Sequence, residues 1–574
     1  MRPLLLPLRS LLGICALGAP LSAAAQDLHP PGAVIEGAVH ADITPGGFDA
    51  ITALLPALVP TGLEIPAVGD SYEGVFGQCW LGGYEYSLTN GAVDIAITSA
   101  SLVPQSGYLQ LDADMEIAVN SEASPLNLLL AVECIETDCD AWVSPFSANI
   151  STTLALQVTG SGSSRQLDAQ VGTINLTHGL SSSNIVIDDC WIGTVEDVLG
   201  FFGLSIFDLI LPLVEDQLAG AVADFGPEIE ALIEESFASL TISETIDLAG
   251  SEATLELYPS AVDIQPAGVR LTLDGSMSSV APADCVADYD MGGSLMTANE
   301  PPGLGTAPAE IGSDFHAGIL ISDDFGNQAL YSAWRGGLLC YTLDENADIG
   351  IPITTSLLGL LAGDSFDELF PTSAPMVLQT RPKAPPTLEF SGEHDLGIEV
   401  EQLGLEFYAE LDNRMARVLA VDLDALAGVD LELDGATGAL AINVALSGED
   451  VIPSVTHNEF VPDASAEIEA QFSGVFDSLV GSLIGGLVGD LAFNLPSIEG
   501  LGLTSLETAA AGPAGDWLGA YATLGPVSYT SAGCGEDGGG CDMGCASGSR
   551  APGSGWLLLG LPLALAGLRR RPGA

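Results

Sequence analysis

Apolar and polar residues alternate with a period of two over most of the chain. In residues 109–119, LQLDADMEIAV, the apolar side chains fall on one side and Gln110, Asp112, Asp114 and Glu116 fall on the other. Residues 429–446, VDLELDGATGALAINVAL, follow the same pattern around a Gly-rich hairpin signal. This alternation predicts antiparallel strands with one dry face and one wet face.

Other stretches carry apolar residues three or four positions apart, which predicts helices with one apolar stripe. The two longest are residues 195–213, with a kink expected at Pro212, and residues 468–487. A further helix is expected at 227–237, where Pro227 suits a first turn. A shorter helix is predicted at 45–59, and its counterpart in the second half is predicted near 354–369.

The order of these elements repeats along the chain. Residues 34–273 and 338–524 each predict a strand, a helix, several strands, a long helix and further strands. Residues 280–312 are rich in Pro, Gly and Ala and are predicted to be a linker. We therefore expect an N-terminal unit at 26–279 and a C-terminal unit at 313–530, both of α+β class.

Four stretches resemble the family of tubular lipid-binding proteins that contains bactericidal/permeability-increasing protein and lipopolysaccharide-binding protein. They are GAVHADITPGGFDAITALLPALVPTGLEIPAVGDSY (37–72), IDLAGSEATLELYPSAVDIQPAGVRLTLDGSM (246–277), AWRGGLLCYTLDENADIGIP (333–352) and LPSIEGLGLTSLETAAAGPAGDWLGAYATL (495–524). The order of these stretches over almost the whole body carries the resemblance, because each alone is mostly apolar.

The resemblance implies a boomerang of two pseudo-symmetric barrels joined by a central sheet. Each barrel would be a twisted antiparallel sheet wrapped around a long helix, with an apolar pocket for lipid acyl chains. The residues we expect to line the two pockets are Ile51, Leu55, Leu58, Val198, Phe202 and Leu209 in the first unit, and Leu357, Leu361, Phe472, Phe476, Leu479 and Leu483 in the second. Ordinary core packing is the alternative role for each, and a surface scaffold or adhesion protein with filled barrels is the alternative function.

The charge of the chain departs from that of lipopolysaccharide-binding members, which present basic residues at the N-terminal tip. The whole chain has 13 Lys and Arg against 77 Asp and Glu, a net charge of −64. Such a field repels nucleic acid and anionic membranes. The expected ligand is therefore a phospholipid held by its acyl chains rather than by its phosphate.

Six cysteines lie between the two ends of the chain, and an even number in an exported protein indicates three disulfides. The spacings are wide and no histidines are nearby, which argues against zinc. Members of the resembled family have one disulfide that ties the N-terminal sheet to its long helix, and Cys190 suits the helix side. Among fifteen possible pairings we favour Cys79 with Cys190, Cys134 with Cys139, and Cys285 with Cys340.

Both ends of the chain carry targeting patterns. Residues 1–25 combine Arg2 and Arg9, a short apolar core and Ala23-Ala24-Ala25, which predicts a cleaved signal peptide rather than an uncleaved anchor. Residues 534–574 hold a Cys/Gly-rich segment, an apolar stretch at 556–568 and the run Arg569-Arg570-Arg571. This tail resembles the Cys-containing sorting tails of myxobacterial surface proteins, which implies attachment through Cys541 or Cys545; a plain C-terminal anchor is the alternative. We expect an exported protein that is at the cell surface, associated with the outer membrane, or secreted.

Motifs for catalysis, metals and cofactors are missing from the sequence. It contains no GxxxxGK, HExxH or GxSxG motif, and its histidines are scattered singly. The loop DENADIG (344–350) has its glycine one position late for an EF-hand and lacks the closing glutamate. We expect no cofactor, no metal, no enzymatic activity and a monomer, although a Ser-His-Asp triad assembled from distant residues is recognised only by geometry.

Overall fold

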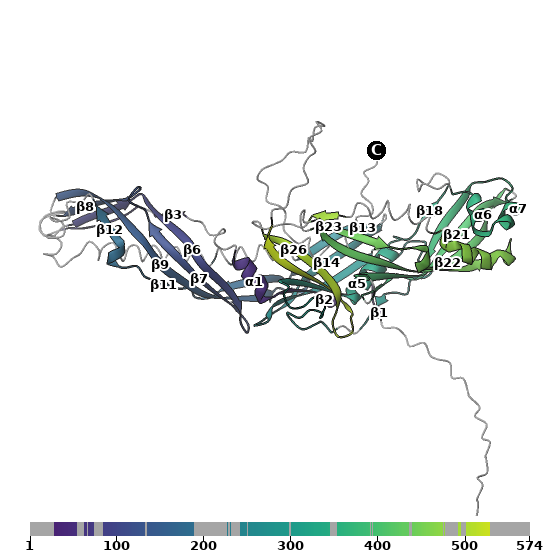
Figure 1. The fold of residues 1–574 in the computed structure, drawn as a ribbon, viewed down its shortest axis with the longest axis horizontal. Coiled ribbons are helices and arrows are strands. Elements are labelled where there is room, and N and C mark those ends of the chain that lie inside the picture. The colour runs from purple at the N-terminus through teal and green to yellow at the C-terminus, as the bar shows by residue number, and fades with distance from the viewer. Residues whose placement is uncertain are drawn as a thin grey trace, which may run out of the picture.

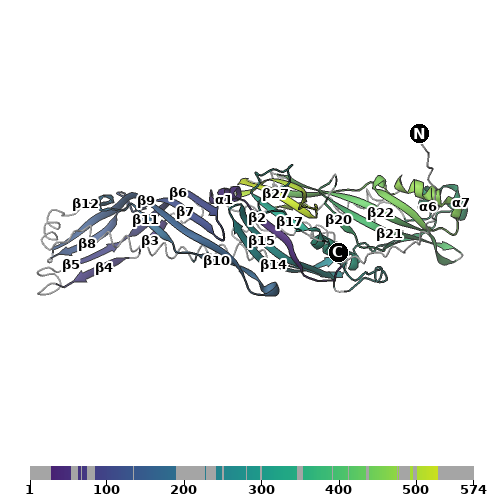
Figure 2. The same cartoon turned by 90° about the horizontal axis from the view of Figure 1, so that it is seen from below.

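The computed structural model describes most of the chain between residues 28 and 527. The described residues are 28–53, 62–65, 67–73, 84–132, 135–188, 227, 230, 241–248, 251–279, 281–297, 300–344, 353–390, 392, 394–411, 413–434, 439–474, 476, 492–494 and 501–527. They form mostly antiparallel strands in three large sheets, which lie in a row along an elongated molecule (Figure 1). The second view shows the same row, with β8 and β12 at one end and α6 and α7 at the other (Figure 2).

The N-terminal sheet has ten strands in the order β3-β6-β7-β9-β8-β5-β4, with β10, β11 and β12 also paired to β9. Their bounds are β3 Gly62–Ile65, β4 Val68–Tyr72, β5 Tyr84–Thr89, β6 Gly91–Pro104, β7 Leu109–Val119, β8 Leu126–Val132, β9 Ile135–Thr159, β10 Gln166–Val171, β11 Asn175–His178 and β12 Ile185–Asp188. Strand β7 covers the predicted residues 109–119. Five of its apolar side chains are buried while Asp114 and Glu116 are exposed, so the predicted alternation is confirmed.

Two asparagines allow the long strands of this sheet to bend. Asn90 (φ 62°) joins β5 to β6, and Asn120 (φ 54°) follows β7. The left-handed region is one that asparagine tolerates better than most residues. The Asn120 side chain donates to the Asn90 carbonyl at 2.9 Å and accepts from the Ala92 amide at 2.8 Å. The two bends are therefore held side by side.

The central sheet has seven strands in the order β13-β14-β15-β2-β17-β27-β26. Their bounds are β13 Ile242–Leu248, β14 Ser251–Gln265, β15 Gly268–Ser279, β2 Ile35–Ile43, β17 Ala317–Ser322, β27 Trp517–Pro526 and β26 Leu501–Ala511. Strands β2 and β17 pair in the middle, with Ala41 opposite Ile319, and each is flanked by a hairpin of its own half. The two halves thus share one sheet and enter it in the same order.

The helix that corresponds to α1 (Pro45–Thr52) in the second half is α5 (Asp323–Arg335). Each follows its central strand and is capped by a hydroxyl side chain, Thr44 before α1 and Ser322 before α5. Helix α1 contacts β27 of the second half, and α5 contacts β15 of the first. The prediction that residues 354–369 are the counterpart of α1 was therefore wrong.

The two faces of the central sheet have different covers. On one face α5 packs against β2, β15 and β17 through an apolar cluster that includes Val39, Leu273 and Phe325. On the other face the chain at 302–315 lies over the sheet, where Phe315 packs against Tyr521 and the carbonyl of Pro302 accepts from Arg270. Both faces of this sheet are consequently covered.

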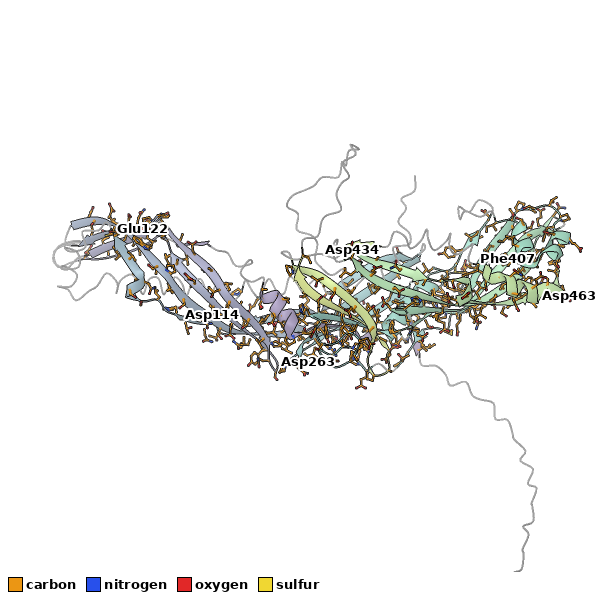
Figure 3. The ribbon with its side chains drawn as sticks, in the orientation of Figure 1. Asp114, Glu122, Asp263, Phe407, Asp434 and Asp463 are labelled. Carbon is orange, nitrogen blue, oxygen red and sulfur yellow. A yellow bond between two sulfur atoms is a disulfide. The ribbon has the colours of Figure 1, made fainter. Side chains whose placement is uncertain are left out.

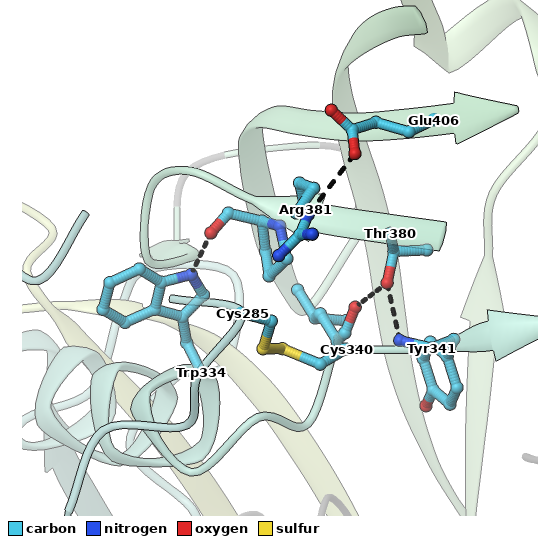
Figure 4. The surroundings of a disulfide bond; sticks show 9 residues. Cys285, Trp334, Cys340, Tyr341, Thr380, Arg381 and Glu406 are labelled. Carbon is cyan, nitrogen blue, oxygen red and sulfur yellow. Dashed lines mark hydrogen bonds and ion pairs between the residues drawn. A yellow bond between two sulfur atoms is a disulfide. The ribbon is translucent and has the colours of Figure 1, made fainter. Parts of the chain in front are cut away.

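The segment predicted to be a linker is fixed to the C-terminal end of α5 and to the chain that follows it. Cys285 is joined to Cys340 by a disulfide, the pair favoured from the sequence (Figure 4). Arg335 forms an ion pair with Asp290 at 2.9 Å. A two-stranded sheet of β1 (Leu28–His29) and β16 (Ser294–Leu295) closes the same region. Cys139 is also disulfide-bonded; Cys79, Cys134 and Cys190 lie outside the described residues.

The C-terminal sheet has eight strands in the order β18-β19-β21-β22-β23-β25, with β20 paired to β21 and β24 paired to β22. Their bounds are β18 Thr342–Leu343, β19 Met376–Pro382, β20 Thr387–Glu389, β21 Leu396–Leu411, β22 Arg414–Asp434, β23 Ala439–Ala445, β24 Val451–His457 and β25 Ala492–Asn494. Strands β22 and β23 pair as the hairpin predicted within 429–446, which confirms that prediction.

Helices gather at the far end of this sheet (Figure 1). They are α6 (Ser356–Ala362), α7 (Asp364–Leu369) and a helix at residues 465–474. Gly363 divides the helix predicted near 354–369, because its φ of 52° is incompatible with a continuous α-helix. Short 3-10 turns occur at Gly162–Ser164, Ser182–Asn184, Gly448–Asp450 and Pro462–Ala464.

The predicted long helices fall largely outside the described residues. Residues 195–213 lie entirely outside, and of 227–237 only Pro227 and Glu230 are described, both helical. Glu230 accepts a hydrogen bond from the Val171 amide of β10 at 2.7 Å. The barrels wrapped around long helices therefore stay a prediction, whereas the antiparallel sheets and the shared central sheet are observed.

Candidate functional site

An apolar cluster fills the C-terminal end of the molecule, and we call it the C-terminal core. The dry faces of β19, β21, β22 and β24 form one side of it, and α6, α7 and the helix at 465–474 form the other. Phe407 on β21 is 1% exposed and lies inside this end of the ribbon, whereas the exposed Asp463 is at its outer limit (Figure 3). The period-two pattern of the strands and the stripes of the helices thus meet in one place.

Four residues predicted to line the second pocket belong to this core. Leu357 and Leu361 are one helical turn apart on α6, with 3% and 1% exposed. Phe472 is 1% exposed, and its ring lies 6.2 Å from that of the partly buried Phe476. The sequence therefore identified side chains that lie together. Leu479 and Leu483 fall outside the described residues.

The N-terminal sheet carries an equivalent dry face, which we call the N-terminal core. Buried residues of β7, β8 and β9, among them Ile117, Leu128 and Phe146, form one cluster with Leu180 and Ile185. The opposite face of these strands carries exposed Asp114, Glu116 and Ser147. The sheet is consequently apolar on one side and polar on the other.

The predicted residues of the first pocket are mostly beyond the described part of the chain. Leu55, Leu58, Val198, Phe202 and Leu209 lie outside it. Ile51 is described and is half-buried on α1. On the same helix it is Phe48, 4% exposed, that joins the apolar cluster of Leu109 and Leu154 at the junction with the central sheet.

Prediction from helical stripes missed the strand residues of the C-terminal core. Phe407, Met376 and Val421 are almost fully buried opposite the helices. Alternation within LGLEFYAEL (403–411) marks Leu405, Phe407 and Ala409 as one face. That signal assigns the face, but only the observed register brings β19 and β22 alongside it.

Most basic residues of the body form ion pairs with carboxylates of the same chain. Of the seven Lys and Arg between residues 26 and 533, six contact a carboxylate within 4 Å, namely Arg165, Arg270, Arg335, Arg381, Lys383 and Arg417. Arg414 is exposed at the tip of the β21–β22 hairpin. The described surface therefore offers no cluster of cations to a phosphate-rich head group.

Glu406 shows how such pairs hold the wet face of the C-terminal sheet. It lies between Arg381 at 3.4 Å and Arg417 at 2.7 Å and accepts from Tyr408 at 2.8 Å. Burial alone would raise the pKa of this carboxyl, but the hydrogen bonds from Tyr408 and Arg417 and the two positive charges bring the pKa below its usual value. Glu406 is thus a charged partner that ties β19, β21 and β22 together.

The described residues contain no group of three or more His, Cys, Asp or Glu side chains arranged to hold a metal ion. None of the described helices combines the length and the apolar character that a membrane span requires.

Comparisons with known proteins give structural similarities only. No family model matches the chain, and no curated protein matches it. Among solved structures, the chain is similar to a lipopolysaccharide binding protein at 13% identity, covering 86% of this chain and 100% of that one, with a TM-score of 0.48. A second similarity is to P47 of Clostridium botulinum E1 at 9% identity, covering 87% and 100%, with a TM-score of 0.24.

Proposed function

We propose that this protein binds lipid and holds acyl chains against the dry faces of its two end sheets. The observation that supports this proposal best is that each end sheet turns a continuous apolar face inward, and that four of the residues expected to line a pocket meet in the C-terminal core. A single chain with two such faces at opposite ends can hold two lipids, one at each end. Alternatively, the uptake step and the release step of one lipid exchange can take place at different ends.

The energetics favour exchange rather than permanent capture. Burying a methylene group from water contributes about 0.8 kcal/mol, so two long acyl chains gain a gross ~20 kcal/mol. Nearly all of this gain is equally available inside a bilayer. The protein would therefore pass lipids between apolar environments, and its choice of lipid would depend on the shape of the pocket.

The charge distribution restricts the ligand. Because six of the seven bases of the body are already paired with carboxylates, an anionic head group would meet an acidic surface. We infer recognition through acyl chains, with a zwitterionic or neutral head group directed to solvent. No catalysis and no cofactor are part of this proposal, and the protein acts as a monomer.

Phe476 provides the test, since it is only partly buried at the border of the C-terminal core. The protein is purified without detergent, and co-purified lipids are extracted and identified by mass spectrometry. Uptake of a fluorescent phosphatidylcholine is then measured. We expect Phe476→Trp to lower uptake several-fold while the melting temperature stays within about 2 °C, because the larger ring occupies space used by the ligand. Phe460→Trp is the matched control: Phe460 is 43% exposed at the same end and should leave uptake unchanged.

Absence of both co-purified lipid and uptake in the unaltered protein contradicts the proposal. One observation favours a second function, a surface scaffold with filled end units: Leu357, Leu361 and Phe472 are already buried among other side chains. In that case Phe476→Trp lowers the melting temperature by overpacking and no lipid is recovered.

We further propose that the protein acts outside the cytoplasm, at the cell surface or the outer membrane. The disulfide between Cys285 and Cys340 supports an oxidising compartment. Export would remove residues 1–25, and the tail at 534–574 would attach the protein through Cys541 or Cys545. Mass spectrometry of the mature protein from the producing cell tests both ends; an intact residue 1 or an unprocessed residue 574 counts against this scheme.

A further inference from the structure

Three large apolar side chains are exposed at the far end of the C-terminal sheet, and we call them the C-terminal tip. Leu360 on α6 is 67% exposed, Met415 at the start of β22 is 56% exposed, and Phe460 in the turn after β24 is 43% exposed. Asp463, which follows Phe460 closely in the chain, lies at the outer limit of the molecule (Figure 3). The tip residues thus come from three different elements.

Strand register places these elements at one end. The hairpin of β21 and β22 turns between Leu411 and Arg414. Just inside that turn, Ala409 pairs with Met376, the first residue of β19 after α6 and α7. Strand β24 runs beside β22 towards the same turn and ends at His457. Helix α6, the hairpin and the turn after β24 therefore all lie at the far end of this sheet.

The C-terminal core lies directly beneath the tip. On α6, Leu357 and Leu361 are buried in this core, whereas Leu360 is turned to solvent. Val461, the neighbour of Phe460, also packs against the core. Folding therefore leaves the apolar surface of the tip in water, and its removal from water requires a second apolar phase.

We propose that the C-terminal tip inserts into the surface of a zwitterionic phospholipid bilayer, from which the C-terminal core takes up its lipid. This inference rests on the proposed function. The tip is the end of an elongated molecule, and its three side chains offer much less surface than the ~1,000 Å² or more of a stable protein interface (Figure 1). A bilayer accepts single apolar side chains at its interface without a complementary groove.

The charges around the tip determine the kind of bilayer. Glu410 pairs opposite Met415, Glu459 precedes Phe460, and both carboxylates are exposed. They would be repelled by anionic lipids but attracted by the outward ammonium of a choline head group. Arg414, exposed and without a carboxylate within 4 Å among the described residues, can meet the phosphate that lies deeper.

Sedimentation with phosphatidylcholine vesicles tests the tip in the full exported chain. We expect Leu360→Ser/Met415→Ser to lower the bound fraction at least fivefold, with the melting temperature unchanged within about 2 °C. Leu426→Ser/Ile452→Ser is the matched control and should change binding less than twofold. Its residues are 46% and 69% exposed on the wet face of β22 and β24, roughly 30 Å or more from Met415 along β22.

A tryptophan placed at the tip reports insertion directly, independently of any binding through residues 534–574. In Leu360→Trp, lipids brominated in their acyl chains should quench the added fluorescence and its emission should shift to shorter wavelength. Ile452→Trp should show neither effect. Equal vesicle binding by the tip pair and the control pair, or no quenching at position 360, overturns the proposal.

The insertion and the proposed function fail in different measurements. A short-chain fluorescent phosphatidylcholine below its critical micelle concentration reaches the protein without a bilayer, so the tip pair should take it up as the unaltered protein does. No uptake by any of the proteins overturns the proposed function. Vesicle binding that rises with added phosphatidylglycerol and falls with salt overturns insertion, because it marks electrostatic attraction. A dimer lost in the tip pair, without vesicle binding, also overturns insertion and points to a second copy.

Discussion

His40 illustrates how a single residue can report on the central sheet. It is 6% exposed on β2, its Nδ1 lies 3.0 Å from the hydroxyl of Thr272, and its ring lies 4.9 Å from that of Trp517. Burial, reinforced by the positive charge of Arg270, lowers the pKa of His40 from 6.5 to about 4. The side chain is therefore neutral in the folded protein at neutral pH.

This shift predicts a pH dependence of stability. Between pH 6.5 and 4 the unfolded chain binds a proton at His40 that the folded chain does not, so the free energy of unfolding falls as the pH is lowered through this window, by on the order of 3 kcal/mol. Chemical denaturation at a series of pH values measures the effect. His40→Gln should flatten the curve between these pH values, whereas His394→Gln, at a histidine with 39% of its side chain exposed, should not.

The Arg270–Asp42 pair is the second residue-scale feature of this sheet. Nε and Nη2 of Arg270 donate to the two carboxylate oxygens of Asp42 at 2.7 and 2.6 Å, and both side chains are nearly inaccessible. Removing one partner leaves a buried charge uncompensated. We expect Arg270→Met to lower the free energy of unfolding by about 3–5 kcal/mol. The double variant Arg270→Met/Asp42→Leu should lose much less than the two single variants together; a loss equal to the sum of the Arg270→Met and Asp42→Leu losses would mean that the charges are not coupled.

At the scale of elements, strands were predicted better than the helix at the centre. Strand β7 and the β22–β23 hairpin followed from alternation, because each has one face in water. Helix α5 was missed. Its sequence, DDFGNQALYSAWR, carries polar residues at positions that are buried, so its apolar period is broken. Only the three-dimensional contacts explain why those residues are polar.

The polar residues of α5 bind the ends of neighbouring strands. Gln328, 0% exposed, accepts from the Met277 amide at 2.7 Å and donates to the Ala33 carbonyl at 2.8 Å. Asn327 accepts from the Leu388 amide of β20 at 2.8 Å, and Ser332 donates to the Met277 carbonyl at 2.9 Å. Helix α5 therefore satisfies backbone groups of both halves, which an apolar helix cannot do.

Gln328→Leu tests this function of α5. The substitution keeps the volume but leaves the buried N–H of Met277 without a partner, at roughly 1–3 kcal/mol, and removes the donor to the half-buried C=O of Ala33. We expect thermal and denaturant unfolding to show a loss of that order. Gln170→Leu, at an exposed position of β10, should change the free energy of unfolding by less than about 0.5 kcal/mol. A similar loss in both variants would contradict the assigned role.

Part of the candidate site could also be predicted from the sequence, because part of it depends on local patterns. Helical spacing marked Leu357, Leu361, Phe472 and Phe476, since a stripe on a helix is a local property of the sequence. The residues that complete the core, such as Phe407 and Met376, come from strands separated by loops of differing length. Their meeting depends on register, including the shift within β21 after Val400, which no local pattern reveals.

At the scale of the whole molecule, the disulfide between Cys285 and Cys340 limits how far the two halves can separate. It spans 55 residues of sequence and fastens the chain before α5 to the chain after it. Trp334 beside it donates to Pro382 of β19 and so extends this connection to the C-terminal sheet (Figure 4). The halves are thus joined covalently as well as by the shared sheet.

Removing this bond should destabilise the protein mainly by freeing the unfolded chain. For a loop of this length the chain-entropy argument gives about 4 kcal/mol, and measured losses are typically 2–4 kcal/mol. We expect Cys285→Ser/Cys340→Ser to lower the free energy of unfolding by that amount in guanidinium titrations. Reducing agent should destabilise the unaltered protein but add less to the double variant; an unchanged midpoint in the double variant would contradict the prediction.

The pairing of β2 with β17 has a consequence for any attempt to divide the molecule. Each strand supplies one side of its backbone to its own half and the other side to the opposite half. A fragment cut within residues 280–312 would present a bare, largely apolar strand with an open row of amides and carbonyls, and such edges recruit further copies. Neither fragment should behave as an independent folding unit: isolated pieces would assemble with each other when mixed, or precipitate when alone.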